Sequence, residues 1–150
     1  MPKAKKLPKK SPPPVESLAT SLHIGASSVS MMVAERSANG TLTPIDFLEQ
    51  PAPVARDIFR QGTVSLSTTE RVVSIIKGYQ KSLSELGLDP HSITRTAATN
   101  IFSEARNHET VMNRIRVACG LKVGTIDDGE MTRLIYLKTR RRLKDMPTTQ

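Results

Sequence analysis

The chain has 150 residues, a length that fits one compact domain and hardly allows two. Hydrophobic residues make up 37% of it and aromatic residues only 3%, which argues against a stacking platform for single-stranded nucleic acid. A single cysteine excludes an internal disulfide framework and a multi-cysteine zinc site. No apolar run approaches the length of about 20 residues that spans a bilayer, so we expect no membrane association.

The net charge of +8 comes from the two ends of the chain. Residues 1–16 are rich in lysine and proline, and we expect a disordered, basic, proline-rich arm there. Residues 140–150 form a basic tail, and residues 17–139 between them form the folded lobe. Two clusters of positive charge predict non-specific binding of polyanions. The arm lacks the apolar stretch of a secretion signal, so the expected compartment is the cytoplasm.

The first part of the lobe has the pattern of three consecutive antiparallel strands. Apolar-rich runs at 18–24 and 29–35 flank a turn of small residues, and Asn39-Gly40 then precedes a third run at 41–48. Asparagine followed by glycine is the strongest short-range signal for a hairpin. Residues 50–66 contain two prolines and a glycine, which predicts an irregular connection.

The rest of the lobe alternates between helical and strand patterns. Ser67 and Glu70 match a capping box, and apolar residues recur at helical spacing from there to Gly87. A strand at 93–99 is followed by a helix that ends near Cys119, by a strand at 121–126 and by a helix at 129–143. The predicted fold is therefore α/β, a mixed sheet with helices in the order βββ-α-β-α-β-α.

Three loops at strand ends could carry chemistry. The turn of small residues could present backbone N–H groups and hydroxyls to an anion, although an ordinary hairpin turn is the better explanation of this pattern by itself. A second loop leads into a helix N-terminus, and a third carries carboxylates that either take part in catalysis or complement the helix dipole. The candidate phosphate-binding residues are Gly25, Ala26, Ser27, Ser28, Thr99 and Asn100, and the carboxylates are Asp127, Asp128 and Glu130.

These three segments resemble, in order, the motifs of one known family. LHIGASSV at 22–29 resembles I-D-x-G-S-N-S, and ATNIFSEARN at 98–107 resembles A-T-S-A-x-R-E-A-x-N. IDDGEMTRLIY at 126–136 resembles I-S-G-x-E-E-A-R-L-x-Y. The family is the exopolyphosphatase/guanosine pentaphosphate phosphohydrolase (Ppx/GppA) family of the actin-like ATPase superfamily. The resemblance implies a single ribonuclease H-like lobe, the N-terminal one, without the family's second lobe.

The chain departs from the family at positions that matter for catalysis. His23 stands where the family has its loop aspartate, and Ser103 stands where it has an arginine. Glu130 keeps the first of two paired glutamates, but the second, which resembles the general base, falls on Met131. The resemblance implies magnesium as the cofactor, yet an imidazole at His23 is a poor ligand for that hard cation. We therefore assign no metal ligand. The role of the general base is empty unless Glu130 or Asp128 takes it.

The resemblance implies a lobe of a hydrolase that acts on polyphosphate or guanosine pentaphosphate, and we expect this chain to be inactive by itself. One alternative is a non-catalytic module that binds or senses a phosphate polymer or a nucleotide. Another is one half of a split enzyme. Apolar residues on the last helix, among them Met131 and Leu134, predict either self-association or a partner that supplies the second lobe.

Overall fold

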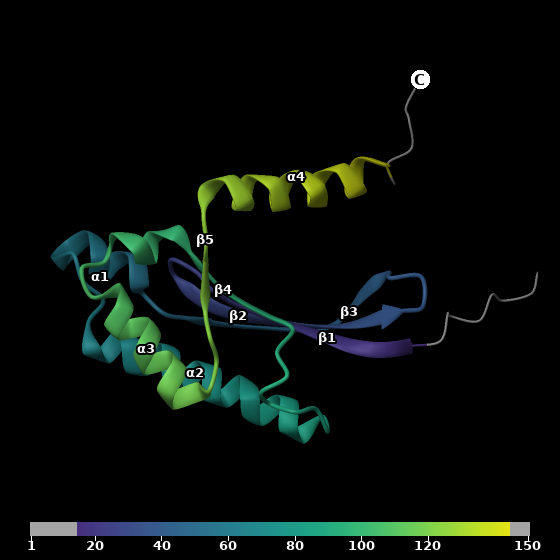
Figure 1. Ribbon diagram of the computed structural model, residues 1–150, viewed down its shortest axis with the longest axis horizontal. Helices are drawn as coiled ribbons and strands as arrows, with labels where there is room; N and C mark the ends of the chain where they lie inside the picture. Colours follow the sequence, from purple (N-terminus) through teal and green to yellow (C-terminus); the bar gives the residue numbers. More distant parts are fainter. Residues whose placement is uncertain (1–14, 145–150) are drawn as a thin grey trace, which may run out of the picture.

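The computed structural model describes residues 15–144 (Figure 1). Residues 1–14 of the predicted arm and residues 145–150 of the predicted tail lie outside the described residues. The first strand begins at Val15, inside the stretch expected to be disordered, and the last helix runs to Lys144. The elements in chain order are β1 (Val15–Ile24), β2 (Ser28–Ser37), β3 (Leu42–Pro51), α1 (Val54–Gln61), α2 (Leu66–Glu85), β4 (Arg95–Thr99), the 3-10 helix η1 (Asn100–Glu104), α3 (His108–Cys119), β5 (Gly124–Ile126) and α4 (Asp128–Lys144).

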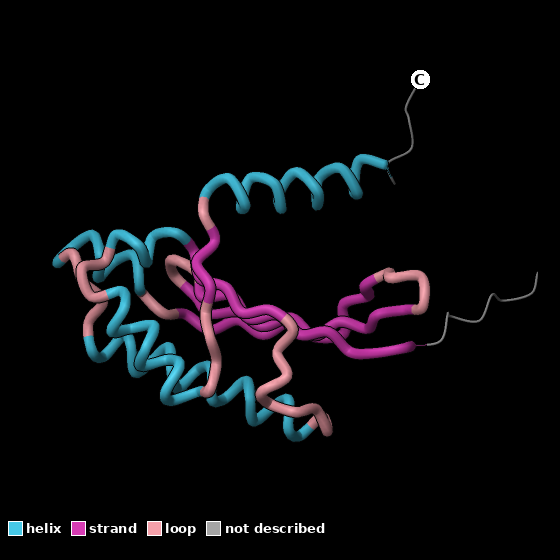
Figure 2. Tube along the Cα trace, in the orientation of Figure 1, coloured by secondary structure: helices cyan, strands magenta, loops and turns pink. Residues whose placement is uncertain are grey.

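The five strands form one mixed sheet in the order β3-β2-β1-β4-β5 (Figure 2). Strands β1, β2 and β3 pair antiparallel, as the hairpin signals predict, whereas β4 pairs parallel with both β1 and β5. The predicted α/β class and the predicted order of strands and principal helices are confirmed. β1, the first strand of the chain, occupies the centre of the sheet.

The sheet buries one face against α2 and α3, while α4 lies over the other face (Figure 1). Side chains on the helix-covered face alternate along the strands, since successive residues of a strand point to opposite sides. Leu22 and Ile24 of β1 and Met31 of β2 are fully buried there. None of the described side chains of α4 is buried, so this helix contributes little to the core.

The prediction of an irregular connection at 50–66 was wrong, because this stretch contains α1. The residues that suggested irregularity mark the two ends of the helix. Pro53 lies just before the first turn, where its missing N–H costs no helical hydrogen bond. Gly62 ends the helix with a φ of 72°, a left-handed conformation that glycine adopts without strain.

The predicted cap of α2 was also misplaced. The N-cap is Ser65, whose Oγ accepts from the Thr68 N–H at 3.1 Å, and Ser67 already lies inside the helix. Glu70 does not reach back to Ser67; it forms an ion pair of 2.7 Å with Arg114 on α3. The pair joins two helices that pack side by side.

The strands of the second half are shorter than predicted, and the helix after β4 is interrupted. β4 begins at Arg95 and β5 at Gly124. Directly after Thr99 the chain forms η1, and the α-helix begins only at His108. Asn107 explains the delay, since its amide pairs with both the N–H and the C=O of Val64 at 3.0 and 2.8 Å.

Asp57 of α1 is a buried carboxylate that holds the start of α2. It accepts from the Ser65 N–H at 3.0 Å and from the Ser65 hydroxyl at 2.5 Å. Burial raises the pKa of Asp57, but hydrogen bonds from the hydroxyls of Ser65 and Thr68 outweigh it and hold the pKa below the ordinary value. The carboxylate therefore stabilises the fold above the ordinary pKa of aspartate, and this contribution is lost as the pH falls through the folded-state pKa.

We expect Asp57→Asn to lower the free energy of unfolding by about 1–3 kcal/mol at pH 7, because the hydroxyl and N–H of Ser65 lose a charged acceptor. The difference from the wild type should shrink as the pH falls below about 4. Urea unfolding at a series of pH values measures both effects. The matched control is Glu104→Gln, an exposed carboxylate. Equal stability of Asp57→Asn and the wild type at pH 7 would contradict this account.

Candidate functional site

The sheet topology brings the three predicted loops to one edge. β1, β4 and β5 run parallel, so the residues that follow Ile24, Thr99 and Ile126 all leave the sheet at its carboxyl-terminal side. In open α/β sheets this is the side on which ligands bind. The candidate site is the loop of residues 25–28 together with the neighbouring ends of β4 and β5.

The loop of residues 25–28 is held by its carbonyl groups. The Ala26 carbonyl accepts from the Ala55 N–H at 2.7 Å, and the Ser27 carbonyl accepts from the Ala52 N–H at 2.9 Å. The Gly25 N–H donates to the Ser28 carbonyl at 2.8 Å and so closes the turn. The N–H groups of Ala26 and Ser27 donate to no backbone carbonyl within residues 15–144. Two successive amides of this turn thus have no backbone acceptor, and groups of this kind can bind an anion.

The two serines of this loop differ in their surroundings. Ser27 is exposed, and its hydroxyl can turn toward a ligand. The Ser28 hydroxyl instead donates to Glu49 Oε1 at 2.7 Å. The Ser28 hydroxyl is therefore already engaged in a hydrogen bond, and the carboxylate of Glu49 would repel a phosphate group. Ser28 is a weaker candidate for phosphate binding than the sequence alone predicts.

His23 and Thr99 carry the two buried side-chain polar atoms that have no hydrogen-bond partner within the described residues. The atoms are His23 Nε2 and Thr99 Oγ1, on the adjacent strands β1 and β4. Burial lowers the pKa of the His23 imidazole below its ordinary value, so the ring is neutral at pH 7. The position of the family's loop aspartate therefore holds an uncharged ring.

The second loop does not form the helix N-terminus that we predicted as an anion site. Asn100 starts η1, which has only five residues. Its side-chain Oδ1 and its carbonyl both accept from the Ser103 hydroxyl at 2.7 Å. The side chain that replaces the family's arginine therefore bonds within η1 and brings no cation to the site.

The carboxylates of the third loop have structural partners. Asp127 caps α4, since its Oδ1 accepts from the Glu130 N–H at 2.7 Å. Glu130 Oε1 lies 3.1 Å from Arg95 and 3.7 Å from Arg133, and Met131 beside it is half-buried. Asp127 and Glu130 thus both have partners within the protein, which favours the helix-terminal interpretation of this cluster over the catalytic one.

The residues at this edge do not fit a magnesium ion. Within residues 15–144 no group of three or more His, Cys, Asp or Glu side chains could hold a metal. Magnesium prefers carboxylate and water oxygens in octahedral geometry. The side chain at position 23, where the resemblance would place an aspartate, is the imidazole of His23.

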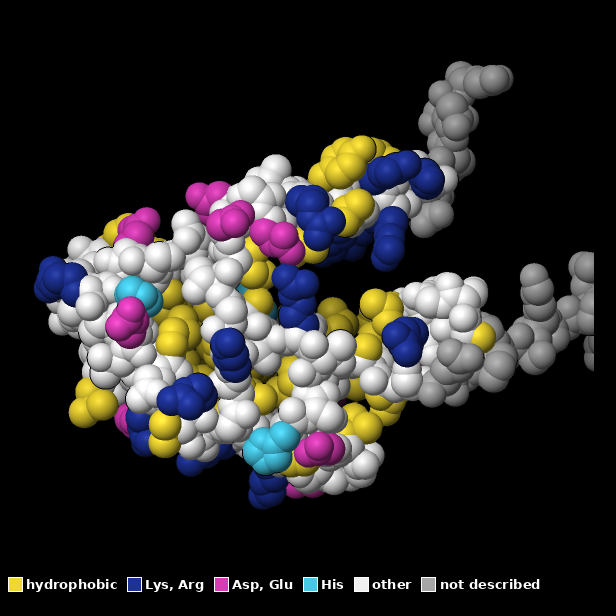
Figure 3. Space-filling model, viewed as in Figure 1, with side chains coloured by type: hydrophobic (Ala, Val, Ile, Leu, Met, Phe, Trp, Pro, Cys, Tyr) yellow, Lys and Arg dark blue, Asp and Glu magenta, His cyan; other side chains and the backbone are white. Residues whose placement is uncertain are grey.

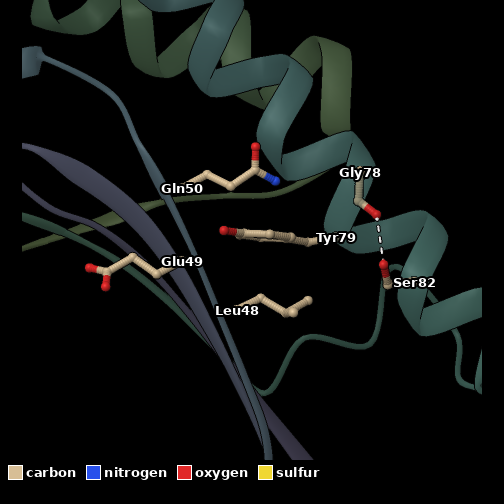
Figure 4. Close-up of a pocket in the computed structure, with 6 residues that line it drawn as sticks. All are labelled: Leu48, Glu49, Gln50, Gly78, Tyr79 and Ser82. Carbon is tan, nitrogen blue, oxygen red and sulfur yellow. Dashed lines mark hydrogen bonds between the residues drawn. The ribbon is translucent and has the colours of Figure 1, made fainter.

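A cavity of about 220 Å³ that the sequence did not predict lies between β3 and α2. Figure 4 shows Leu48 and Gln50 of β3 projecting toward Tyr79 of α2, while Glu49 projects from the opposite side of the strand. The Tyr79 hydroxyl donates to the Val29 carbonyl at 2.8 Å and is thus already satisfied. A helix-period pattern places Tyr79 in the core, but only the pairing of β3 with β2 reveals the cavity beside it.

Comparison with known proteins identifies the class of fold. No protein-family model and no curated protein sequence matches this chain. Among solved structures, the Ppx/GppA family member of Aquifex aeolicus matches with a TM-score of 0.67 and 22% identity, over 74% of this chain and 35% of its own. An exopolyphosphatase from Cytophaga hutchinsonii matches with a TM-score of 0.66 and 12% identity, over 75% of this chain and 35% of its own.

The chain therefore has the α/β fold of one lobe of the Ppx/GppA structures, as the sequence motifs led us to expect. It spans about a third of the length of the proteins it matches. In residues 15–144 there is no helix with the length and apolar character needed to cross a lipid bilayer.

Proposed function

We propose that this chain is a degenerate N-terminal lobe of the Ppx/GppA type that binds a phosphate-containing ligand and does not hydrolyse it. The observation that supports binding is the pair of adjacent amides at Ala26 and Ser27, which donate to no backbone carbonyl within residues 15–144. Linear polyphosphate or a guanosine nucleotide is the ligand class that the resemblance implies.

The absence of hydrolysis follows from the chemistry at three positions. Phosphoryl transfer depends on positioning and on charges that stabilise the transferred group. Here His23 is neutral, Ser103 bonds to Asn100, and Met131 has no group that accepts a proton. Glu130 remains, but its carboxylate is paired with Arg95 and Arg133.

A second candidate function is one half of an enzyme whose other lobe lies on a separate chain. The observation that favours it is the apolar surface of α4, which no described part of the chain covers. Ile135, Tyr136 and Leu143 of this helix are each about 60% exposed. Exposed apolar side chains of this size are typical of interfaces.

We expect the purified chain to release no phosphate from polyphosphate or guanosine pentaphosphate, with or without magnesium. His23→Asp, Met131→Glu and the double variant should also be inactive, because the members of such a site act together and one repair does not restore the others. A phosphate-release assay measures this, with the Aquifex aeolicus Ppx/GppA phosphatase as the positive control.

Two outcomes of this assay would change the proposal. Magnesium-dependent phosphate release by the wild type that is lost in Glu130→Gln would make Glu130 the base and the chain an enzyme. Inactivity combined with no binding of pyrophosphate would remove the phosphate-binding function itself. Calorimetric titration with pyrophosphate, run beside the assay, separates the two.

A further inference from the structure

The outer edge of β3 is an open edge of the sheet. β3 lies at one end of the strand order, so within residues 15–144 no strand pairs with its far side. All of its residues except Leu48 are exposed, and Leu42, Ile45 and Phe47 are large apolar side chains that are each more than half exposed. Figure 3 shows hydrophobic side chains at the surface around the β2–β3 hairpin. Long exposed edge strands with apolar side chains are sites at which chains associate.

Phe47 and Glu49 direct their backbone N–H and C=O groups away from β2. The Ala52 N–H donates to the Ser27 carbonyl at 2.9 Å, and the register of the two strands continues regularly from that pair. In an antiparallel ladder every second residue bonds to the same neighbour, so the even-numbered residues in this part of β3 bond to β2. The odd-numbered residues between them face outward. In agreement, the Phe47 N–H donates to Asp46 Oδ1 at 2.8 Å.

The rest of this edge is closed to pairing. Pro44 and Pro51 have no N–H, and the Pro51 carbonyl already accepts from Arg71 Nε at 2.6 Å. The register of β2 and β3 shifts next to Pro44 and leaves Ile45 as an extra residue in β3. Prolines and bulges are the features by which proteins keep edge strands from pairing. Only the stretch 47–49 is left open, so a strand that pairs here can do so in few registers.

A hollow lies beside the open stretch, on the side of α2. It is the cavity of about 220 Å³, whose lining includes Leu48 of β3 and Gly78, Tyr79 and Ser82 of α2 (Figure 4). A Cβ at Gly78 would meet nothing within 4 Å. Glycine weakens the interior of a helix relative to alanine, and no packing within the described residues requires it here. A side chain that arrives from outside along β3 would fill this space.

We propose that two copies of this chain associate edge to edge through β3, in antiparallel orientation, and form one continuous sheet. A two-fold axis brings the same stretch of both edges together. Phe47 of each copy then lies opposite Glu49 of the other, and each such pair exchanges two backbone hydrogen bonds. The Asp46 side chain releases the Phe47 N–H to the Glu49 carbonyl of the second copy, so one hydrogen bond replaces another.

The side chains select this register over the neighbouring ones. Pairing of Glu49 with Glu49 would place two carboxylates directly opposite each other, which destabilises a sheet. Pairing of Phe47 with Phe47 would place the apolar Leu48 opposite the carboxylate of Asp46. In the proposed register Leu48 lies opposite Leu48 of the second copy, and both leucines enter the hollow beside Gly78.

The open stretch is short, so the interface is small and we expect a weak dimer that forms as the concentration rises. The surface consists of β3 and α2. The proposal therefore depends neither on phosphate binding by residues 25–28 nor on the apolar side chains of α4, and it can fail without either of them.

Sedimentation velocity of the full chain over a range of concentrations measures the association. Glu49→Pro removes the open N–H from each copy and leaves the hydrogen bonds between β2 and β3 in place. We expect it to weaken dimerisation at least about tenfold, as the loss of two backbone hydrogen bonds predicts. The matched control Glu49→Ala loses the same carboxylate but keeps the N–H, so it should dimerise nearly as well as the wild type. Circular dichroism checks that both variants fold.

A disulfide tests the register without the use of proline. Leu48 and Leu48 of the second copy form a pair without hydrogen bonds between them, whose Cα atoms lie about 4.5 Å apart, within the range that a disulfide spans. On mild oxidation Leu48→Cys should form a covalent dimer at least about tenfold faster than Phe59→Cys, although Phe59 is the more exposed residue. The native Cys119 is buried, so the wild type should not cross-link.

Three results would overturn the proposal. The first is a monomer at every concentration. The second is equal dimerisation of Glu49→Pro and Glu49→Ala, which would show that the copies meet at another surface, such as the apolar side of α4. The third is cross-linking of Leu48→Cys at the rate of Phe59→Cys, which would reduce the contact to random collision.

Discussion

Replacing Phe102 by alanine is expected to lower the free energy of unfolding by about 3–5 kcal/mol. Phe102 lies in η1, is fully buried and is among the largest side chains of the core. Its removal leaves a cavity that the surrounding helices and strands fill only in part. Because a domain of this size is stable by about 5–15 kcal/mol, the variant should lose a large part of its stability.

Urea unfolding followed by circular dichroism measures this loss. The matched control is Phe59→Ala on α1, where the same side chain is 77% exposed. We expect that change to stay within about 0.5 kcal/mol of the wild type, as surface substitutions usually do. Similar effects of the two substitutions would mean that η1 does not pack into the core as described.

The second large effect is expected at Gly25, where valine should abolish pyrophosphate binding by the loop. A Cβ on Gly25 would lie 3.1 Å from the Ser28 carbonyl oxygen and 3.5 Å from His23 Cε1. The turn must shift to admit it, and a branched side chain worsens the contact. The shift moves the amides of Ala26 and Ser27, on which the proposed binding rests.

Calorimetry with pyrophosphate measures the loss at Gly25. Gly78→Ala is the control, because a Cβ at this position of α2 meets nothing within 4 Å. It should leave binding unchanged and raise stability by about 0.5–1 kcal/mol, since alanine is the better helix former. Undiminished binding by Gly25→Val would show that the loop is not the phosphate site.

The order of the elements could be predicted because each carries its own local signal. The Asn39-Gly40 turn and the helical spacing of apolar residues before Gly87 depend on neighbours in the sequence only. The delayed start of α3 could not be predicted in this way. It depends on the amide of Asn107 reaching Val64, 43 residues earlier in the chain.

In the candidate site, too, local features could be predicted from the sequence and contacts between distant residues could not. The motifs locate the three loops, and the parallel pairing of β1 with β4 follows from the fold that they imply. The partners of the polar side chains do not follow, because they come from other elements. The Ser28 hydroxyl donates a hydrogen bond to Glu49 because β2 and β3 pair in a register that brings the two side chains together. Arg95 donates to Glu130 because α4 begins close to β4.

The central position of β1 has a consequence for the order of folding. β1 can pair with β2 soon after synthesis, but its other edge stays open until β4 arrives, and Thr20 and Thr94 are 74 residues apart. Pairing across such a separation is slow, since a long loop must close before contacts form. During that interval an unpaired strand edge is exposed, which promotes aggregation. A nascent chain that stops before Arg95 keeps this edge open and should depend on chaperones to remain unaggregated.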